Sequence, residues 1–217
     1  WISYVEKLAD RWRSAVTEGD TVVIPGDISW ATELSEAIPD LLFLDSLPGK
    51  KILLKGNRDY WWQTAKKNKE AFEKNGITTI TLLHNNSLCA EGFSLCGSRG
   101  WFSDTASPSG VDYDKLVKRE ASRIERSIID AEKTSSTGEK LVFLHFPPVF
   151  ESFVCPEIIE VLKKHDIKRV FFGHIHNRYG IPRAFVYDDI EYRCVSADYL
   201  DFYPLLIRQT GHTGAAV

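Results

Sequence analysis

The sequence contains no methionine and only four cysteines among its 217 residues. The cysteines form no CxxC pair and are too few for a disulfide framework in a chain of this length. We therefore expect reduced, mostly buried thiols at Cys89, Cys96, Cys155 and Cys194, a usage that favours a cytoplasmic location. Because the chain starts at Trp1 and has no methionine, we expect that it is not a complete gene product.

Long apolar runs are also lacking. No stretch approaches the roughly 18 apolar residues of a membrane-spanning helix, and no basic region precedes an apolar stretch in the manner of a signal peptide. The formal net charge of -3 excludes the polybasic field with which proteins hold nucleic acid in bulk. We expect a soluble protein with no membrane partner and no bulk nucleic-acid binding, which leaves nucleic acid open as a substrate.

The phosphate-binding signatures of nucleotide-binding α/β proteins are absent as well. The chain contains neither GxGxxG nor the Walker-type GxxxxGK. Such loops cradle phosphate groups with backbone N–H groups at the start of a helix. A doubly wound nucleotide-binding protein that works without metal is therefore disfavoured.

The apolar residues predict one α/β domain over residues 1–217. Hydrophobic residues make up 43% of the chain, enough for a substantial core, and no repeat or linker divides it. Their spacing predicts helices over residues 1–17, 33–47 with a bend at Pro39, 60–75, 112–133 and 155–166. Compact apolar runs predict strands over residues 21–24, 51–54, 140–144 and 168–172, with hairpins in 77–101 and 183–197.

Four of the predicted strands end in polar residues that are able to bind a metal ion. "TVVIPGD" ends in Asp27, "KILLKGN" in Asn57, "KLVFLH" in His145, and "KRVFFGHIH" in His174 and His176. If these strands are parallel neighbours in an α/β sheet, their C-terminal ends share one edge, where such folds bind ligands. A carboxylate, an amide oxygen and imidazoles suit divalent Mn, Fe, Zn, Co or Ni, so the pattern predicts a metal site.

Each of these residues also has an ordinary structural explanation. An aspartate or asparagine after glycine usually forms a turn, and His145 before Pro147 could be a half-buried residue at the end of a strand. The pair of His174 and His176 is more specific, because alternate residues of an extended segment point the same way. Four such strand ends together favour a metal site over four separate turns.

The motifs "GDIS", "GNRD", "LHFPP" and "GHIH", in this order, resemble the calcineurin-like metallophosphoesterase superfamily. The resemblance extends from Thr21 to "SADYLDFYPLLI", and "PGDISWA", "CGSRGW" and "SADYLDF" are similar to a bacterial subgroup of predicted phosphohydrolases. It implies a single domain with a four-layer α/β/β/α sandwich of two mixed sheets flanked by helices. It also implies a centre of two divalent metal ions.

The resemblance assigns a role to each candidate ligand. Asp27 would bridge the two ions, Asn57, His145 and His174 would complete the shell of the second ion, and His176 would bind the first. The implied reaction is hydrolysis of a phosphomonoester or phosphodiester by a metal-activated hydroxide. Its substrate would be a small-molecule or nucleotide phosphoester.

The sequence departs from the family pattern at its start. The first family motif, Asp-x-His on an opening strand, supplies further ligands, and nothing before Thr21 matches it. We therefore expect that a strand precedes Trp1 in the full protein. A protein that lacked this strand would keep only Asp27 and His176 for the first ion.

The second departure lies in the loop Gly-Asn-His-Asp, which here reads "GNRD", with Arg58 and Asp59 as candidate catalytic residues. Arginine does not release a proton near neutral pH, but its forked donors can position phosphate oxygens. An equally weighted hypothesis is that Arg58 pairs with Asp59 and only closes the loop. Arg99 in "GSRGW" is a second candidate for substrate binding. These departures motivate an alternative function, a catalytically impaired metal-binding relative that binds a phosphorylated ligand without turnover.

Four tryptophans follow the loops that carry these residues, namely Trp30, Trp61, Trp62 and Trp101. Core packing is favoured for them over an apolar wall or a stacking platform for a nucleobase. The remaining histidines have no strand-end context and are expected to be surface or structural residues, namely His84, His165 and His212.

Overall fold

The computed structural model describes residues 3–102, 112–134 and 138–207. Of the individual residues discussed in the sequence analysis, His212 lies outside the described ranges. Among the described residues, no helix combines the length and the apolar character that crossing a membrane requires.

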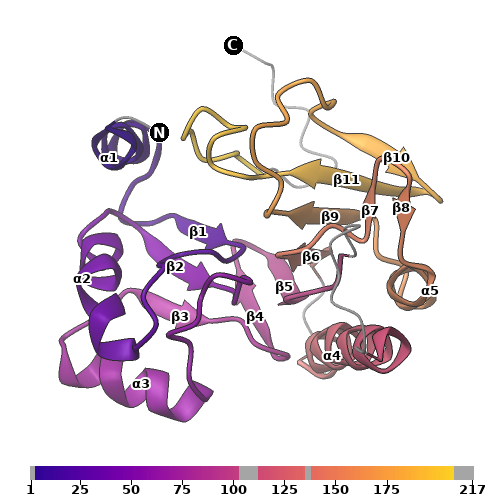
Figure 1. Cartoon of the computed structure of the whole chain (residues 1–217), viewed down its shortest axis with the longest axis horizontal. Coiled ribbons are helices and arrows are strands. Elements are labelled where there is room, and N and C mark those ends of the chain that lie inside the picture. Colours follow the sequence, from indigo (N-terminus) through magenta and orange to yellow (C-terminus); the bar gives the residue numbers. More distant parts are fainter. Residues whose placement is uncertain (1–2, 103–111, 135–137, 208–217) are drawn as a thin grey trace.

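The smaller sheet contains three parallel strands in the order β1-β2-β3. They are β1 (Thr21–Ile24), β2 (Lys50–Leu53) and β3 (Ile80–Leu82). Three helices pack against its outer face (Figure 1), α1 (Tyr4–Ala15), α2 (Leu34–Asp45) and α3 (Ala65–Lys74). Leu41, Leu53 and Phe72 belong to the apolar cluster that joins these helices to the sheet.

The larger sheet has six strands in the order β10-β11-β9-β6-β5-β4, with β10 and β4 antiparallel to their neighbours. Its strands are β4 (Ser87–Ala90), β5 (Phe93–Ser98), β6 (Lys140–Leu144), β9 (Arg169–Phe172), β10 (Phe185–Tyr187) and β11 (Ile190–Cys194). The helices α4 (Tyr113–Lys133) and α5 (Pro156–Lys164) cover its outer face. A short hairpin of β7 (Val149–Phe150) and β8 (Phe153–Val154) was not predicted.

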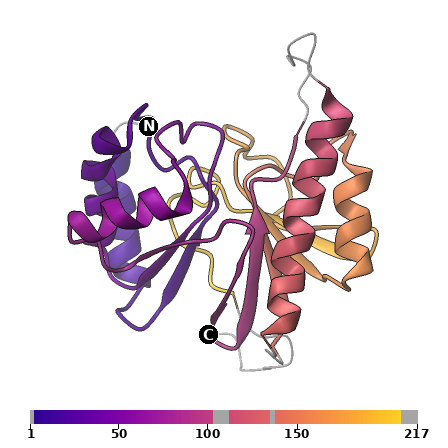
Figure 2. The same cartoon turned by 90° about the horizontal axis from the view of Figure 1, so that it is seen from below.

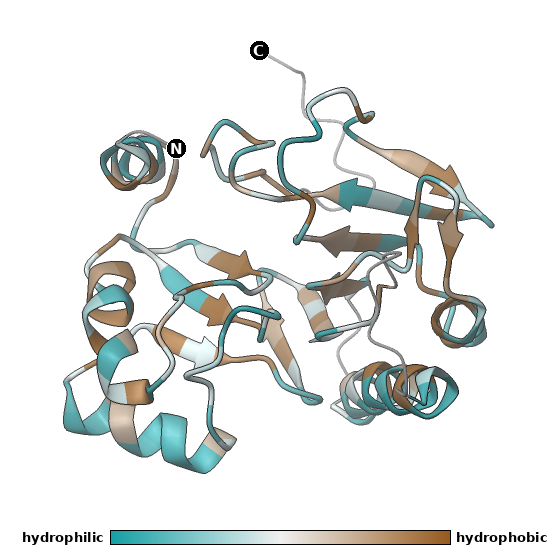
Figure 3. Cartoon of the chain, in the orientation of Figure 1, coloured by the Kyte–Doolittle hydropathy of each residue, from teal (hydrophilic) through white to brown (hydrophobic). Residues whose placement is uncertain are grey.

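The two sheets pack face to face, so helices lie on both outer sides of the sandwich (Figure 2). Strand alternation decides which side chains enter each core. Leu141 and Phe143 of β6 join the cluster between the sheets, whereas Val142 and Leu144 contact the helices α4 and α5. The apolar strands and the hydrophilic outer faces of the helices are visible in Figure 3.

The predicted four-layer α/β/β/α class is confirmed. Within the described residues the smaller sheet is parallel throughout, because its strands are joined by crossovers that contain helices, whereas the larger sheet is mixed. The hairpin predicted in residues 77–101 is formed by β4 and β5 alone, since Ile80–Leu82 joins the parallel sheet.

One local prediction needs correction in the helices next to the smaller sheet. The helix predicted from residue 60 begins at Ala65, because Trp61 and Trp62 are buried and Thr64 accepts a hydrogen bond from the N–H of Lys67 as the N-cap. Pro39 lies inside α2, which continues through it to Asp45, and the predicted bend at Pro39 stays a prediction.

Candidate metal centre

The polar residues that follow β1, β2, β6 and β9 meet at one rim of the sandwich. The prediction placed these four strands in one sheet, and this is wrong, because β1 and β2 belong to the smaller sheet and β6 and β9 to the larger. In Figure 1 the arrowheads of β1 and β9 point toward each other across the interface. The cluster of polar residues was expected at the C-terminal edge of a single sheet. It is formed instead by the C-terminal edges of two packed sheets.

Two glycines let the loops after β1 and β2 approach closely. A Cβ on Gly26 would lie 2.4 Å from the backbone nitrogen of Gly56, and a Cβ on Gly56 would lie 2.2 Å from Oδ1 of Asp27. Gly26 also has a φ of 95°, which L side chains rarely adopt. The glycine in each motif is thus needed to bring Asp27 beside Asn57.

Four side chains form the core of the site. One ligand atom each from Asp27, His145 and His174 lies within 4.8 Å of the others. The amide oxygen of Asn57 lies 2.6 Å from Nε2 of His145 and 3.1 Å from Nδ1 of His174. The structure therefore brings together four of the five predicted metal ligands.

The hydrogen bond of His145 with the backbone determines which ring nitrogen faces the cluster. Its Nδ1 donates to the carbonyl of Pro25 at 2.9 Å, so Nε2 directs a lone pair toward Asn57 and toward Asp27, whose Oδ1 lies 3.6 Å away. Burial lowers the pKa of His145 to about 4, so the ring is neutral at ordinary pH.

Several acceptors therefore converge at the cluster, and a cation placed among them would relieve the contacts between their lone pairs. One carboxylate, one amide oxygen and two imidazoles form the kind of donor set that divalent transition metals prefer. The site consequently fits the metal that the sequence predicts.

Strained backbone accompanies the cluster. Asp27 has a φ of 57° and His174 a φ of 67°, both in the left-handed region that residues with a Cβ rarely adopt. Such conformations persist where the surrounding structure holds them, and they are common at functional sites. Both residues lie in the loops that follow β1 and β9, and both contribute a ligand atom to the cluster.

His176 is oriented by a residue that the sequence reasoning missed. Its Nδ1 donates to Oδ1 of Asp198 at 2.8 Å, and the other carboxylate oxygen accepts the N–H of Asn177 at 2.9 Å. This arrangement directs Nε2 away from Asp198, the arrangement found for histidine ligands supported by a carboxylate. His176 is not one of the three residues that lie within 4.8 Å of one another, so its predicted metal contact stays a prediction. The motif "SADYLDF", which contains Asp198, was the available signal.

The carboxylate of Asp59 joins the loops after β1 and β2. It is 1% exposed and accepts the backbone N–H groups of Asp27 at 2.8 Å, Ile28 at 2.8 Å and Gly56 at 2.7 Å. The indole N–H of Trp61 donates to it as well, at 3.0 Å. Burial raises the pKa of Asp59, and the N–H groups act in the opposite direction. These contacts support a positioning role, while the predicted catalytic role stays a prediction.

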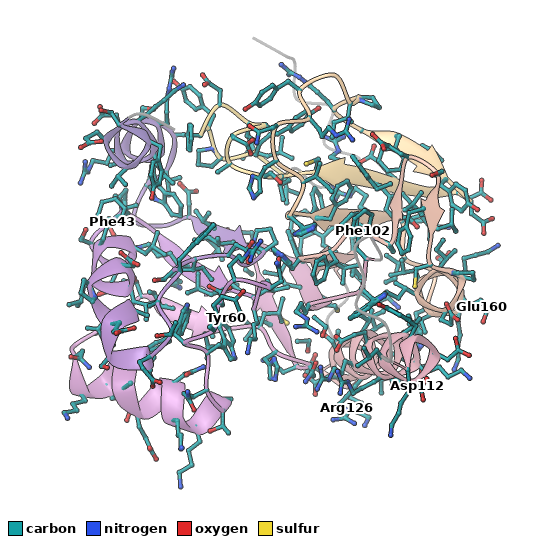
Figure 4. The ribbon with its side chains drawn as sticks, in the orientation of Figure 1. Phe43, Tyr60, Phe102, Asp112, Arg126 and Glu160 are labelled. Carbon is teal, nitrogen blue, oxygen red and sulfur yellow. The ribbon has the colours of Figure 1, made fainter. Side chains whose placement is uncertain are left out.

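Arg58 lies at the exposed end of the same loop. Its backbone N–H donates to Oδ1 of Asp27 at 2.8 Å, while its guanidinium lies 5.4 Å from the ring centroid of Trp30. The guanidinium also donates to the hydroxyl of Tyr60, labelled in Figure 4, at 3.3 Å. Within the described ranges no ion pair joins it to Asp59, so the hypothesis that this pair closes the loop is wrong.

Arg99 follows β5 and lies beside the cluster. Its carbonyl accepts the backbone N–H groups of His145 at 3.1 Å and Phe146 at 2.9 Å, and its guanidinium lies 5.9 Å from the ring centroid of Phe146. The predicted contact of Arg99 with substrate stays a prediction.

The cluster opens into a cavity of about 1550 Å³ that runs along β1 to α1. Asp27 and His174 lie at one end, and the walls beside β1 are apolar. Trp30 also lines this cavity and is 74% exposed, whereas Trp61 and Trp62 are buried. Core packing is therefore confirmed for Trp61 and Trp62 and is wrong for Trp30.

Comparison with known proteins agrees with this geometry. The sequence profile of the calcineurin-like phosphoesterase family matches residues 3–178. The chain belongs to the calcineurin-like phosphoesterase family. No curated protein matches it in sequence.

Two solved structures share the fold of this chain over most of its length. The protein TT1561 of Thermus thermophilus superimposes with a TM-score of 0.58 at 13% identity, covering 89% of this chain and 83% of its own. Another crystal structure superimposes with a TM-score of 0.56, also at 13% identity, covering 88% of this chain and 84% of its own. At this identity the likeness concerns the fold alone.

Asp59→Asn is expected to lower the free energy of unfolding by about 2–4 kcal/mol, because an amide nitrogen would face buried N–H donors. Urea unfolding followed by circular dichroism measures this. The matched control, Asp10→Asn, changes an exposed aspartate and should stay within about 0.5 kcal/mol of the unmodified chain. Equal stability of the two variants would contradict the positioning role of Asp59.

Asp198→Asn is expected to weaken divalent-metal binding about 10–100-fold, because His176 loses the acceptor that orients its ring. Titration with Mn²⁺ followed by calorimetry measures the change. Asp201→Asn is the control, since Asp201 is exposed and forms ion pairs with Lys7 and Arg11 instead. Unchanged affinity in Asp198→Asn would show that this carboxylate does not support a metal ligand.

Proposed function

We propose that this family member is a divalent-metal-dependent phosphoesterase that hydrolyses a phosphomonoester or a phosphodiester. The observation that carries the proposal is the convergence of acceptors from Asp27, Asn57, His145 and His174 at one rim of the sandwich. Membership of the calcineurin-like phosphoesterase family supports the same class of reaction.

The donor set supports a centre of two divalent ions. Asn57, His145 and His174 would hold one ion together with Asp27, and His176 would contribute to a second ion that shares Asp27. Oxygen and imidazole donors without thiolate suit Mn, Fe, Zn, Co or Ni. When bound, the ions supply Lewis acidity that offsets the charge of the phosphoryl group and lowers the pKa of the attacking water.

Arg58 is suited to hold the phosphoryl group in place. Its backbone is fixed to Asp27 by a 2.8 Å hydrogen bond, its side chain is exposed, and it lines the cavity that contains the cluster. A guanidinium can donate two parallel hydrogen bonds to phosphate oxygens. It does not supply a proton to a leaving group near neutral pH. The proposal therefore favours substrates with good leaving groups.

The cavity supports a small-molecule or nucleotide phosphoester as substrate. Trp30 presents an exposed aromatic face beside Arg58, and aromatic faces of this kind stack on planar groups such as nucleobases. We place the enzyme in the cytoplasm, which the four free cysteines support.

Asn57→Ala is expected to reduce the hydrolysis of bis-p-nitrophenyl phosphate at least about 100-fold and to lower the content of bound metal, because the amide oxygen is central to the cluster. Metal content by inductively coupled plasma mass spectrometry and kcat/KM are the two measurements. His165→Ala is the control, since His165 lies at the end of α5 and pairs with Glu125 and Glu132. The proposal would be contradicted if the unmodified chain bound none of the five metals and hydrolysed neither a phosphomonoester nor a phosphodiester.

Arg58→His separates hydrolysis from binding without turnover. If the site hydrolyses esters but lacks a group that protonates the leaving oxygen, the histidine is expected to raise kcat for an ester with a poor leaving group about 10-fold or more. The reason is that imidazole can act as a general acid. The comparison uses phenyl phosphate and p-nitrophenyl phosphate with metal-loaded protein. No turnover of either ester in the unmodified chain or in Arg58→His would favour the alternative, a relative that only binds a phosphorylated ligand.

A further inference from the structure

Three cationic side chains gather beside the metal centre, on the side formed by β2, β5 and α4. Lys55 follows β2 and precedes Asn57 by two residues, Arg99 follows β5, and Arg123 lies in α4. The carbonyl of Arg99 holds the backbone N–H of His145, so this group and the metal ligands share one scaffold. We call Lys55, Arg99 and Arg123 the cationic cluster.

Lys55 and Arg99 have no counter-charge in contact with them. Within the part of the chain that the structure describes, no carboxylate lies within 4 Å of either side chain, although both are half-buried. The Nζ of Lys55 donates to the carbonyl of Trp62 at 3.4 Å, which is a long hydrogen bond. Burial lowers the pKa of Lys55 and of Arg99, and the charges of Arg99 and Arg123 lower the pKa of Lys55 further. Asp59 acts in the opposite direction on Lys55, and Glu120 does so on Arg99.

The buried carboxylate of Glu120 lies near the cationic cluster, and one of its two oxygens is engaged by arginine side chains while the other, Oε2, has no partner among the described residues. Oε1 of Glu120 accepts a hydrogen bond from Arg123 at 2.6 Å and lies 3.8 Å from Nε of Arg119. Glu120 is 0% exposed, so its carboxylate lies in the interior and not on the solvent-exposed face of α4. The buried carboxylate of Asp59 also acts on Lys55. Four cations, Lys55, Arg99, Arg119 and Arg123, therefore outnumber two carboxylates, and the neighbourhood keeps a positive charge.

Buried donors without acceptors lie in the same neighbourhood. Nε of Arg99 and Nε1 of Trp62 are both buried and have no hydrogen-bond partner among the described residues. Trp62 is 6% exposed, contacts Lys55 through its carbonyl, and lies 6.1 Å from the ring of His84. Because buried donors are normally satisfied, two such donors beside an excess of cations over carboxylates indicate a place where an anion binds.

We propose that Lys55, Arg99 and Arg123 form an anion subsite that binds a second phosphoryl group of the substrate, next to the phosphoester held at the metal centre. A phosphoryl group fits the cluster better than a carboxylate, because it offers more oxygens and more negative charge to several cationic donors at once. The proposal rests on the proposed function for the identity of the scissile group. It adds that the substrate carries an additional phosphate.

Binding of inorganic phosphate to the metal-free chain tests the subsite without any need for turnover. Isothermal titration calorimetry is expected to show one phosphate site, and Lys55→Gln and Arg99→Gln are each expected to weaken it at least tenfold. The matched control is Arg126→Gln, which removes an exposed arginine of α4, labelled in Figure 4, and should change the affinity less than twofold. Circular dichroism checks the fold of each variant, and Lys55→Gln alone carries the test if Arg99→Gln fails to fold.

A second control separates the subsite from the metal centre. Asn57→Ala removes a proposed metal ligand and should leave phosphate binding by the metal-free chain within twofold. Absence of phosphate binding in the unmodified chain would overturn the proposal. So would a loss of binding in Asn57→Ala that is as large as the loss in Lys55→Gln and Arg99→Gln.

Kinetics with metal-loaded protein test the identity of the ligand as part of the substrate. Arg99→Gln is expected to raise KM for adenosine 3′,5′-bisphosphate at least tenfold while changing KM for adenosine 5′-monophosphate less than threefold. Equal changes for the two nucleotides would overturn the assignment to a second phosphoryl group. Absence of turnover in the unmodified chain would contradict the proposed function alone, because the calorimetric result does not depend on it.

Discussion

The site depends on the hydrogen bonds by which one buried carboxylate holds two loops together. Asp59 accepts N–H groups from Asp27, Ile28 and Gly56, and so fixes the loop after β1 against the loop after β2. Hydrogen bonds to charged acceptors are stronger than those between neutral groups, and here they offset part of the cost of burying the charge of Asp59. The hydrogen bond from the N–H of Asp27 helps to hold that residue in its left-handed conformation, with a φ of 57°.

The second level of organisation is the packing of the two sheets. Phe143 of β6 and Phe171 of β9 stack with ring centroids 5.0 Å apart in the apolar cluster between the sheets, where Ile52 and Leu54 approach from the smaller sheet. The packing of the smaller sheet on the larger one through this cluster sets the distance between the ends of their strands. It therefore also sets the distance between the polar residues that follow those strands. Nitrogen and oxygen acceptors from both sheets then converge, and the arrangement favours a cation.

The sequence was most informative where a pattern is local or carries a family motif. Apolar runs ending in Asp27, Asn57, His145 and His174 predicted the strand ends, and the ordered motifs predicted the four layers. The division of these strands between two sheets could not be read from the runs, because strand periodicity carries no information about which sheet a strand joins. Contacts between side chains far apart in the sequence could not be predicted either. An example is the hydrogen bond between His176 and Asp198, which are 22 residues apart.

The central claim is that Asp27, Asn57, His145 and His174 surround one divalent cation. Anomalous diffraction at the zinc absorption edge, from crystals of the protein soaked in Zn²⁺, tests it most directly. The account predicts an anomalous peak with the Asp27 carboxylate, Asn57 Oδ1, His145 Nε2 and a ring nitrogen of His174 about 2.0–2.2 Å away. A fully soaked crystal with no peak at this position, or with zinc bound only elsewhere, would contradict it.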